Sequence, residues 1–173
     1  KEICAETANM TNQCVQAVNF NCPGQIVIAG ATEAVHKACD RLKEAGAKRA
    51  ILLPVSAPFH STLMQPAADR LKEVLDSVEI VDAKIPVVAN VNAKPETKAD
   101  EIRSQLVLQA ASPVLWEDSV RRMMNDGVDT FVEVGPGKVL CGFIKKVDRS
   151  YAPLNVEDME SLEKSLAYLK EVR

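Results

Sequence analysis

The chain has 173 residues, of which 47% are hydrophobic and 26% charged, enough for a globular domain with a sizeable core. Its 24 acidic and 21 basic residues are scattered along the sequence, and only 4% of residues are aromatic. This composition predicts no nucleic-acid-binding surface, because phosphates attract clustered cations and bases stack on aromatic rings. No apolar run approaches the roughly 18 residues that span a bilayer, so no membrane segment is expected.

Cysteine and histidine usage limits the chemistry further. The five cysteines (Cys4, Cys14, Cys22, Cys39 and Cys141) are odd in number and form no C-x-x-C pair, which predicts reduced thiols and a cytoplasmic protein. With only two histidines there is no metal-ligand spacing, and no Walker or dinucleotide motif is present. We therefore expect neither a metal site nor a bound cofactor.

The first third of the chain predicts a small mixed unit. Helix, strand, strand, helix and strand are expected at residues 1–8, 15–20, 25–29, 32–45 and 50–55. The opening helix has neither a cap nor a Met before it, which indicates a chain entered in mid-element. The turn cluster Asn21-Cys22-Pro23-Gly24 makes the first two strands a hairpin, while Thr32 caps the second helix and Gly46 ends it. This order predicts a ferredoxin-like small subdomain lacking its first strand, over residues 1–57.

From Pro58 onward, helices and strands alternate. Helices are expected at 63–75, 100–110, 114–125, 138–146 and 159–172, and strands at 86–91 and 130–134. The alternation favours an α/β layer with a largely parallel sheet, over residues 58–173. Gly135-Pro136-Gly137 ends the last strand; it forms either a tight strand-to-helix turn or a place where backbone approaches a substrate.

His60 is the residue best placed for chemistry. It follows the apolar run 50–55 and precedes a helix, and catalytic groups gather at the carboxyl ends of strands in α/β sheets. From position alone a structural role is equally open. His36 lies in an amphipathic helix, which indicates a surface role.

A nucleophile for His60 is not evident in the sequence. No G-x-S-x-G elbow brackets a serine. Ser56 and Ser61 are therefore expected in capping or turn roles. Cys22 has no basic group near it in sequence, which argues against a reactive thiolate.

Four blocks of sequence, in this order and spacing, resemble the malonyl-CoA:acyl carrier protein transacylases. They are Val18-Asn19-Phe20-Asn21-Cys22-Pro23-Gly24-Gln25-Ile26-Val27-Ile28-Ala29-Gly30, Pro54-Val55-Ser56-Ala57-Pro58-Phe59-His60-Ser61, Pro113-Val114-Leu115-Trp116 and Glu133-Val134-Gly135-Pro136-Gly137-Lys138-Val139-Leu140. The resemblance implies an α/β protein, in which the tail of an α/β-hydrolase-like large subdomain follows the small one.

The resemblance also implies roles for individual residues. His60 is expected to serve as general base for a serine that malonyl-CoA acylates. The Leu115 main-chain carbonyl is expected to orient the His60 ring. Phe59, directly before the histidine, is expected to favour malonyl over branched acyl units by steric exclusion, or else simply to pack. Asn21 is expected either to bind substrate or to shape its turn.

The implied reaction moves malonyl from malonyl-CoA to the phosphopantetheine thiol of acyl carrier protein, for fatty acid synthesis. The family's serine elbow, oxyanion loop and malonate-binding arginine would all precede Lys1. The expected partners are therefore acyl carrier protein, malonyl-CoA and an N-terminal segment that carries the serine. Two alternatives stay open: a non-catalytic module that binds carrier protein or CoA, and an acyltransferase for another acyl unit.

Overall fold

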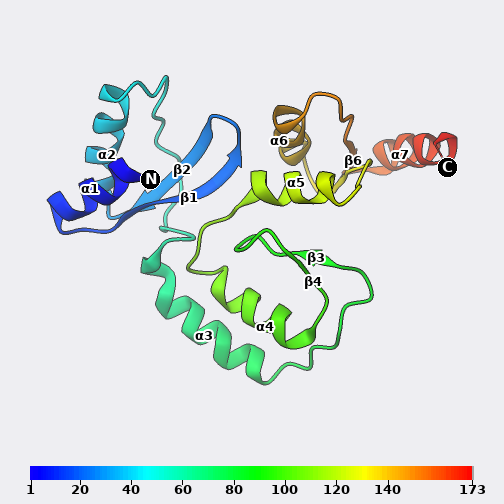
Figure 1. Ribbon diagram of the computed structural model, residues 1–173, viewed down its shortest axis with the longest axis horizontal. Helices are drawn as coiled ribbons and strands as arrows, with labels where there is room; N and C mark the ends of the chain where they lie inside the picture. The colour runs from blue at the N-terminus through cyan, green and yellow to red at the C-terminus, as the bar shows by residue number, and fades with distance from the viewer. Residues whose placement is uncertain (173) are drawn as a thin grey trace.

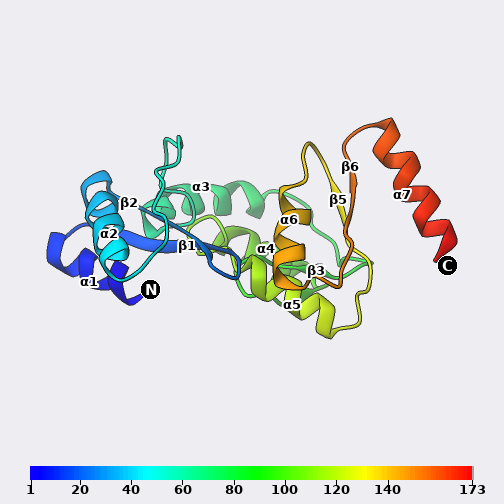
Figure 2. The same cartoon turned by 90° about the horizontal axis from the view of Figure 1, so that it is seen from above.

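The computed structural model describes residues 1–172 and has a mixed α/β architecture; Arg173, the last residue of the second expected unit, lies outside the described residues. Along the chain the elements are α1 (Glu2–Thr11), β1 (Val15–Cys22), β2 (Gln25–Gly30), α2 (Thr32–Glu44), the 3-10 helix η1 (Thr62–Met64), α3 (Gln65–Asp76), β3 (Val87–Val88), β4 (Pro95–Glu96), α4 (Ala99–Leu108), α5 (Trp116–Asn125), β5 (Val132–Val134), α6 (Val139–Val147), β6 (Leu154–Val156) and α7 (Met159–Glu171). The molecule is elongated, with α1 and α2 at one end and α7 at the other (Figures 1 and 2). Of the helices in residues 1–172, none is long and apolar enough to cross a bilayer.

The N-terminal helices pack on the β1–β2 hairpin. The strands are antiparallel, and their register runs from Val15 opposite Gly30 to Cys22 opposite Gln25, which confirms the predicted hairpin. Val15 is buried together with Ala34 and Ala38 of α2. The guanidinium of Arg41 on α2 donates to the Thr7 hydroxyl of α1 at 3.0 Å and pairs with Glu6, so the two helices are also joined by polar contacts.

Helix α2 begins and ends close to the predicted residues. Its N-cap is Ala31, in extended conformation and without a side-chain cap, so the prediction that Thr32 caps the helix is wrong. Thr32 is instead the first helical residue. At the other end Gly46 has a φ of 96° and its N–H donates to the Lys43 carbonyl, which confirms the glycine stop.

Residues 50–55 do not form the predicted strand. The segment is irregular, and four of its apolar side chains, Ile51, Leu52, Leu53 and Val55, are 54% to 70% exposed. A strand exists only when a neighbour satisfies its backbone groups, and the described residues place no such neighbour here. The predicted small subdomain is therefore observed as helix, strand, strand and helix, and its last predicted strand is missing.

The strands of residues 1–172 pair as three two-stranded sheets rather than as one largely parallel sheet. Two pairs, β1–β2 and β3–β4, are antiparallel, and β5–β6 is parallel. The expected strand at 86–91 shortens to Val87–Val88, while β6 was not predicted because Leu154-Asn155-Val156 is too short for a periodic signal. The sequence pattern predicts strands but not their pairing, which depends on residues far apart in the chain.

β1 also contacts the second half of the chain. The Val114 N–H donates to the Val18 carbonyl at 2.8 Å, and the Phe20 N–H donates to the Val114 carbonyl at 2.9 Å. Beyond this bridge, α5 and α6 bury a second core of Val120, Phe131 and Ile144. The hairpin is therefore the element that connects the two halves.

The surface is large for the mass of the chain. The accessible area is 11420 Å², whereas a compact monomer of this mass exposes about 8,300 Å². Part of the difference of roughly 3,100 Å² is apolar, including Ile85 beside β3 and Val134 on β5, which are 77% and 79% exposed. Exposed apolar surface of this kind is suited to packing against other protein surface.

Candidate active site around His60

His60 lies in a tight turn that its own neighbours hold. The Ser61 hydroxyl donates to the Pro58 carbonyl at 2.6 Å, and the Ser61 N–H donates to the same oxygen at 3.2 Å. Ser61 is fully buried, so its hydroxyl serves the turn, as the sequence predicts. His60 itself has a φ of 62°, the left-handed region that a residue with a side chain rarely adopts. Such a conformation is a frequent feature of functional sites.

The His60 ring is oriented by a main-chain carbonyl. Its Nδ1 lies 2.9 Å from the carbonyl oxygen of Gln109, the C-cap residue of α4. Because a carbonyl only accepts hydrogen bonds, Nδ1 carries the proton, and in the neutral ring Nε2 then has the lone pair. The half-buried ring can therefore act as a base through Nε2.

The carbonyl that meets His60 is not the predicted one. The Leu115 carbonyl accepts from the Ser119 N–H at 2.9 Å and the Ser119 hydroxyl at 2.8 Å, inside the first turn of α5. It is thus committed to its own helix, and Gln109 replaces Leu115 as the residue that orients the ring. A sequence signal did exist: the last carbonyls of a helix lack intrahelical partners, and the predicted helix at 100–110 ends beside Gln109.

Phe59 and Asn21 occupy different surroundings. Phe59 adjoins His60 in the chain and its side chain is 50% exposed. Asn21 lies at the turn end of β1, whereas the His60 turn meets the opposite end of that strand, where the Thr62 N–H donates to the Gln16 side chain. Phe59 is therefore beside the histidine, and Asn21 is not brought into hydrogen-bonding contact with the turn.

The cysteines do not supply a nucleophile. All five lie within the described residues and are free thiols. Cys22 is buried and its thiol donates to the Gln25 side chain at 3.4 Å, while burial raises its pKa. Burial likewise raises the pKa of Cys141 to about 11. The Cys22 and Cys141 thiols therefore stay protonated near neutral pH, so they lack the thiolate that nucleophilic attack requires.

The Gly135-Pro136-Gly137 segment is a strand-to-helix turn. Gly135 and Gly137 have φ values of 135° and 89°, which suit glycine. The Gly135 N–H donates to the Val156 carbonyl and the Gly137 N–H to the Glu157 carboxylate, both at 2.9 Å. Both N–H groups are bonded within the chain, as in the tight turn that the sequence predicts, while an approach of this backbone to a substrate stays a prediction.

Glu133 of β5 caps the helix that follows this turn. Its carboxylate accepts from the Cys141 N–H at 2.8 Å and the Leu140 N–H at 3.1 Å, two of the unpaired donors at the start of α6. Burial by itself raises the pKa of Glu133, but the backbone hydrogen bonds from Cys141 and Leu140 bring the pKa below its ordinary value. A lowered pKa in the folded state stabilises the fold above the ordinary value, and this contribution is lost as pH falls through the folded pKa.

Replacing Glu133 with glutamine is expected to lower the free energy of unfolding at pH 7 by about 1 kcal/mol, the usual contribution of a helix cap. The charged acceptor is lost, although a neutral amide oxygen remains. Urea unfolding at a series of pH values from 7 downward measures the effect. The two proteins should converge as pH falls through the lowered pKa of Glu133 in the folded state, because protonation then removes the charge from wild type. A difference that stays constant over the whole series would contradict the capping role.

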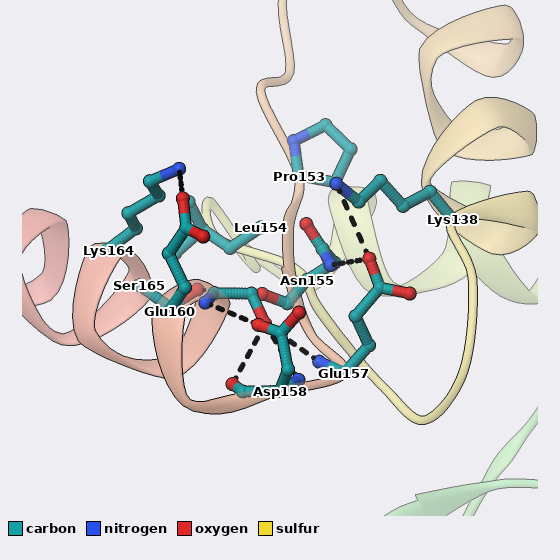
Figure 3. Close-up of a pocket in the computed structure, with 10 residues that line it drawn as sticks. Lys138, Pro153, Leu154, Asn155, Glu157, Asp158, Glu160, Lys164 and Ser165 are labelled. Atoms are coloured by element: carbon teal, nitrogen blue, oxygen red, sulfur yellow. Dashed lines mark hydrogen bonds and ion pairs between the residues drawn. The ribbon is translucent and has the colours of Figure 1, made fainter.

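A surface cavity lies elsewhere, between β6 and α7 (Figure 3). It encloses about 270 Å³ and is lined mainly by polar side chains. Lys164 pairs with Glu160, Lys138 lies 3.5 Å from Glu157, and Asp158 caps α7 through Ser161. The charged groups around the cavity are therefore bonded to one another. Their visible role is to stabilise the start of α7. Within residues 1–172 no group of three or more His, Cys, Asp or Glu side chains is placed to hold a metal ion.

Comparison with known proteins places this chain in a family. Residues 3–165 match the model of the acyl transferase domain, so the chain belongs to the acyl transferase domain family. It is 51% identical over 157 residues, 91% of this chain and 50% of the relative, to malonyl CoA-acyl carrier protein transacylase of Bacillus subtilis (strain 168). The chain thus spans about half the length of the curated relatives it matches.

Solved structures agree with this placement. Malonyl CoA-acyl carrier protein transacylase from Clostridium perfringens superimposes with a TM-score of 0.93 and 43% identity, over 99% of this chain and 53% of that one. A malonyl-transacylase in complex with its type II PKS acyl-carrier protein superimposes with a TM-score of 0.92 and 45% identity, over 96% of this chain and 53% of that one. The described fold is therefore that of one half of these proteins.

Proposed function

We propose that this chain supplies the general base of a malonyltransferase. In this proposal His60 serves the transfer of malonyl from malonyl-CoA to the phosphopantetheine thiol of acyl carrier protein, for fatty acid synthesis. The observation that carries it is the His60 ring, held in a left-handed turn with Nδ1 against the Gln109 carbonyl. That arrangement leaves Nε2 free as an acceptor, as an acyl-transfer base requires.

In the first half-reaction, His60 Nε2 takes the proton of a serine hydroxyl as its oxygen attacks the malonyl thioester carbonyl. The C–S bond of the tetrahedral intermediate then breaks, and the imidazolium returns the proton to the departing CoA thiolate. In the second half-reaction, Nε2 takes the proton of the carrier-protein thiol, whose sulfur attacks the seryl ester. The serine oxygen leaves and recovers its proton from His60. The Gln109 carbonyl stabilises the imidazolium in both halves.

The serine belongs, in this proposal, to an N-terminal segment that packs against this chain. The excess surface of roughly 3,100 Å² supports this arrangement, because each partner of a large permanent interface buries from about 1,000 to more than 2,500 Å². The exposed run at 51–55 and the uncovered edge of β5 are suited to strands of that segment. Residues 1–57 then form a ferredoxin-like small subdomain, and residues 58–173 the tail of an α/β-hydrolase-like large one.

The proposed partners follow from the same reaction. The solved complex of a malonyl-transacylase with its acyl-carrier protein supports a carrier protein as the acceptor. The substrates are malonyl-CoA and the phosphopantetheinylated carrier protein, and the transfer needs no bound cofactor because serine and histidine perform it. Free thiols throughout the described chain support a cytoplasmic location, where thiols stay reduced.

A mass measurement tests the proposal. The protein that joins this chain to its N-terminal segment is incubated with malonyl-CoA, and intact mass spectrometry is expected to show one added malonyl group. Addition of phosphopantetheinylated carrier protein should remove that group and transfer it to the carrier. No labelling by malonyl-CoA would favour a binding module on this scaffold, and labelling only by a different acyl-CoA would favour the other acyltransferase.

Phe59 is expected to set the acyl-unit preference. Phe59 directly precedes His60 in the chain and its ring is half exposed; in this proposal the ring borders the place where the α-carbon of a bound acyl group approaches the base. Phe59→Ala should raise the rate with methylmalonyl-CoA relative to malonyl-CoA by about tenfold, the effect of one methyl group in a packed site. Competition between the two thioesters measures this ratio. An unchanged ratio would indicate that Phe59 only packs.

A further inference from the structure

Two side chains of the hairpin reach the carboxyl side of the His60 turn. The Gln16 side-chain oxygen accepts from the Thr62 N–H at 2.8 Å, and Cys14 Sγ lies 3.5 Å from the Thr62 hydroxyl. Residues two apart in an extended segment point to the same face, so both side chains face Thr62 while Val15 between them enters the core. The alternation at the start of β1 thus creates a contact surface for the turn.

This contact completes the support of a strained residue. The turn is closed by Ser61, which bonds to Pro58 through its hydroxyl and its N–H, and the ring itself is held by Gln109. These bonds hold His60, with its φ of 62°, and Ser61, but they do not reach the N–H of Thr62, the next residue. The Gln16 bond to the Thr62 N–H extends the restraint to that residue, from an element 46 residues away in sequence.

We propose that Gln16 is a positioning residue for His60: it holds the turn so that Nε2 points to the reacting serine. Gln16 touches neither the ring nor a substrate, and acts through Thr62. The kinetic part of the inference rests on the proposed malonyltransferase function. Base catalysis is sensitive to displacements of about 1 Å, so a loosened turn should slow proton transfer without weakening substrate binding.

The test uses the protein that includes its N-terminal segment. Gln16→Ala is expected to slow malonyl labelling about tenfold with an unchanged KM for malonyl-CoA, a split that loss of a positioned base produces. Gln16→Glu keeps an acceptor oxygen at the same reach and should restore most of the rate. Gln65→Ala is the matched control, because Gln65 lies beside the turn and its side chain bonds Asp69 on the surface, while its backbone bond to the Thr62 carbonyl survives the substitution.

A second readout does not depend on activity. Nitrogen-15 NMR of the His60 ring, assigned with His60→Ala, together with the Thr62 amide signal, reports the geometry of the turn. Both signals should move in Gln16→Ala and return toward wild type in Gln16→Glu. If the wild-type protein is never labelled, the proposed function fails while these signals still decide the role of Gln16. The inference is overturned if both NMR signals stay in place in Gln16→Ala. It is also overturned if Gln16→Ala and Gln16→Glu lose the same amount of labelling rate.

Discussion

Replacing His60 with alanine is expected to slow malonyl labelling of the intact protein by about 10²–10⁴-fold, the range that general acid–base catalysis contributes. The structure gives the reason: Nδ1 is committed to the Gln109 carbonyl, which leaves Nε2 as the acceptor for the serine proton. Alanine removes that acceptor while the turn keeps its Ser61–Pro58 bonds. Rapid-quench labelling with malonyl-CoA at pH 7.5, followed by mass spectrometry, measures the rate.

His36→Ala is the matched control, because it removes the other histidine of this chain from an exposed position on α2. Its labelling rate should equal that of wild type. Equal rates in the His60→Ala and His36→Ala variants would remove His60 from the mechanism, even if labelling itself is observed. A His60→Ala protein that unfolds at the same urea concentration as wild type shows that the lost rate is not lost structure.

The elements that the sequence predicted well are those with local causes. The hairpin follows from Pro23-Gly24, and α2 ends at Gly46 because only a residue tolerant of positive φ fits that position. The run at 50–55 has the same apolar character as a buried strand, yet it is irregular, and no strand among the described residues pairs with it. Pairing is a property of two segments, and one segment cannot encode it.

In the candidate site, too, the features with local causes could be predicted and those that depend on distant residues could not. His60 could be predicted from the residues around it, but its left-handed conformation and its contact with Gln109 could not. A main-chain carbonyl is present at every residue, so side-chain identity did not distinguish Gln109 from Leu115. Helix ends distinguish them: the Leu115 carbonyl starts a helix and is used within it, whereas the Gln109 carbonyl ends one and is free for His60.

Substituting Gly30 with alanine is expected to lower the free energy of unfolding by about 3 kcal/mol, the upper end of the usual cost of overpacking. A Cβ at this position would lie 2.0 Å from the Cys14 carbonyl oxygen and 2.6 Å from Val15 Cα. Both are backbone atoms of the neighbouring strand and cannot rotate away. The Ala31 N–H also donates to the Cys14 carbonyl at 2.8 Å, so separating the strands to admit the methyl group breaks that bond.

Gly142→Ala tests the same substitution where space exists. Gly142 lies inside α6 with nothing within 4 Å of an added Cβ, and alanine forms helix more readily than glycine. Its free energy of unfolding should rise by about 0.5–1 kcal/mol. Urea unfolding of the two variants should therefore move in opposite directions, and a shared direction would contradict the close strand contact.

The Gly30 contact also connects stability to the proposed chemistry. The backbone that a methyl group would displace, at Cys14 and Val15, directly precedes Gln16, which holds Thr62 and the His60 turn. Gly30→Ala should therefore slow malonyl labelling even where the protein remains folded, and the loss should be smaller in a protein that already carries Gln16→Ala. Coupling of this kind is measured by a double-mutant cycle. Strictly additive losses would show that the hairpin and the His60 turn act independently.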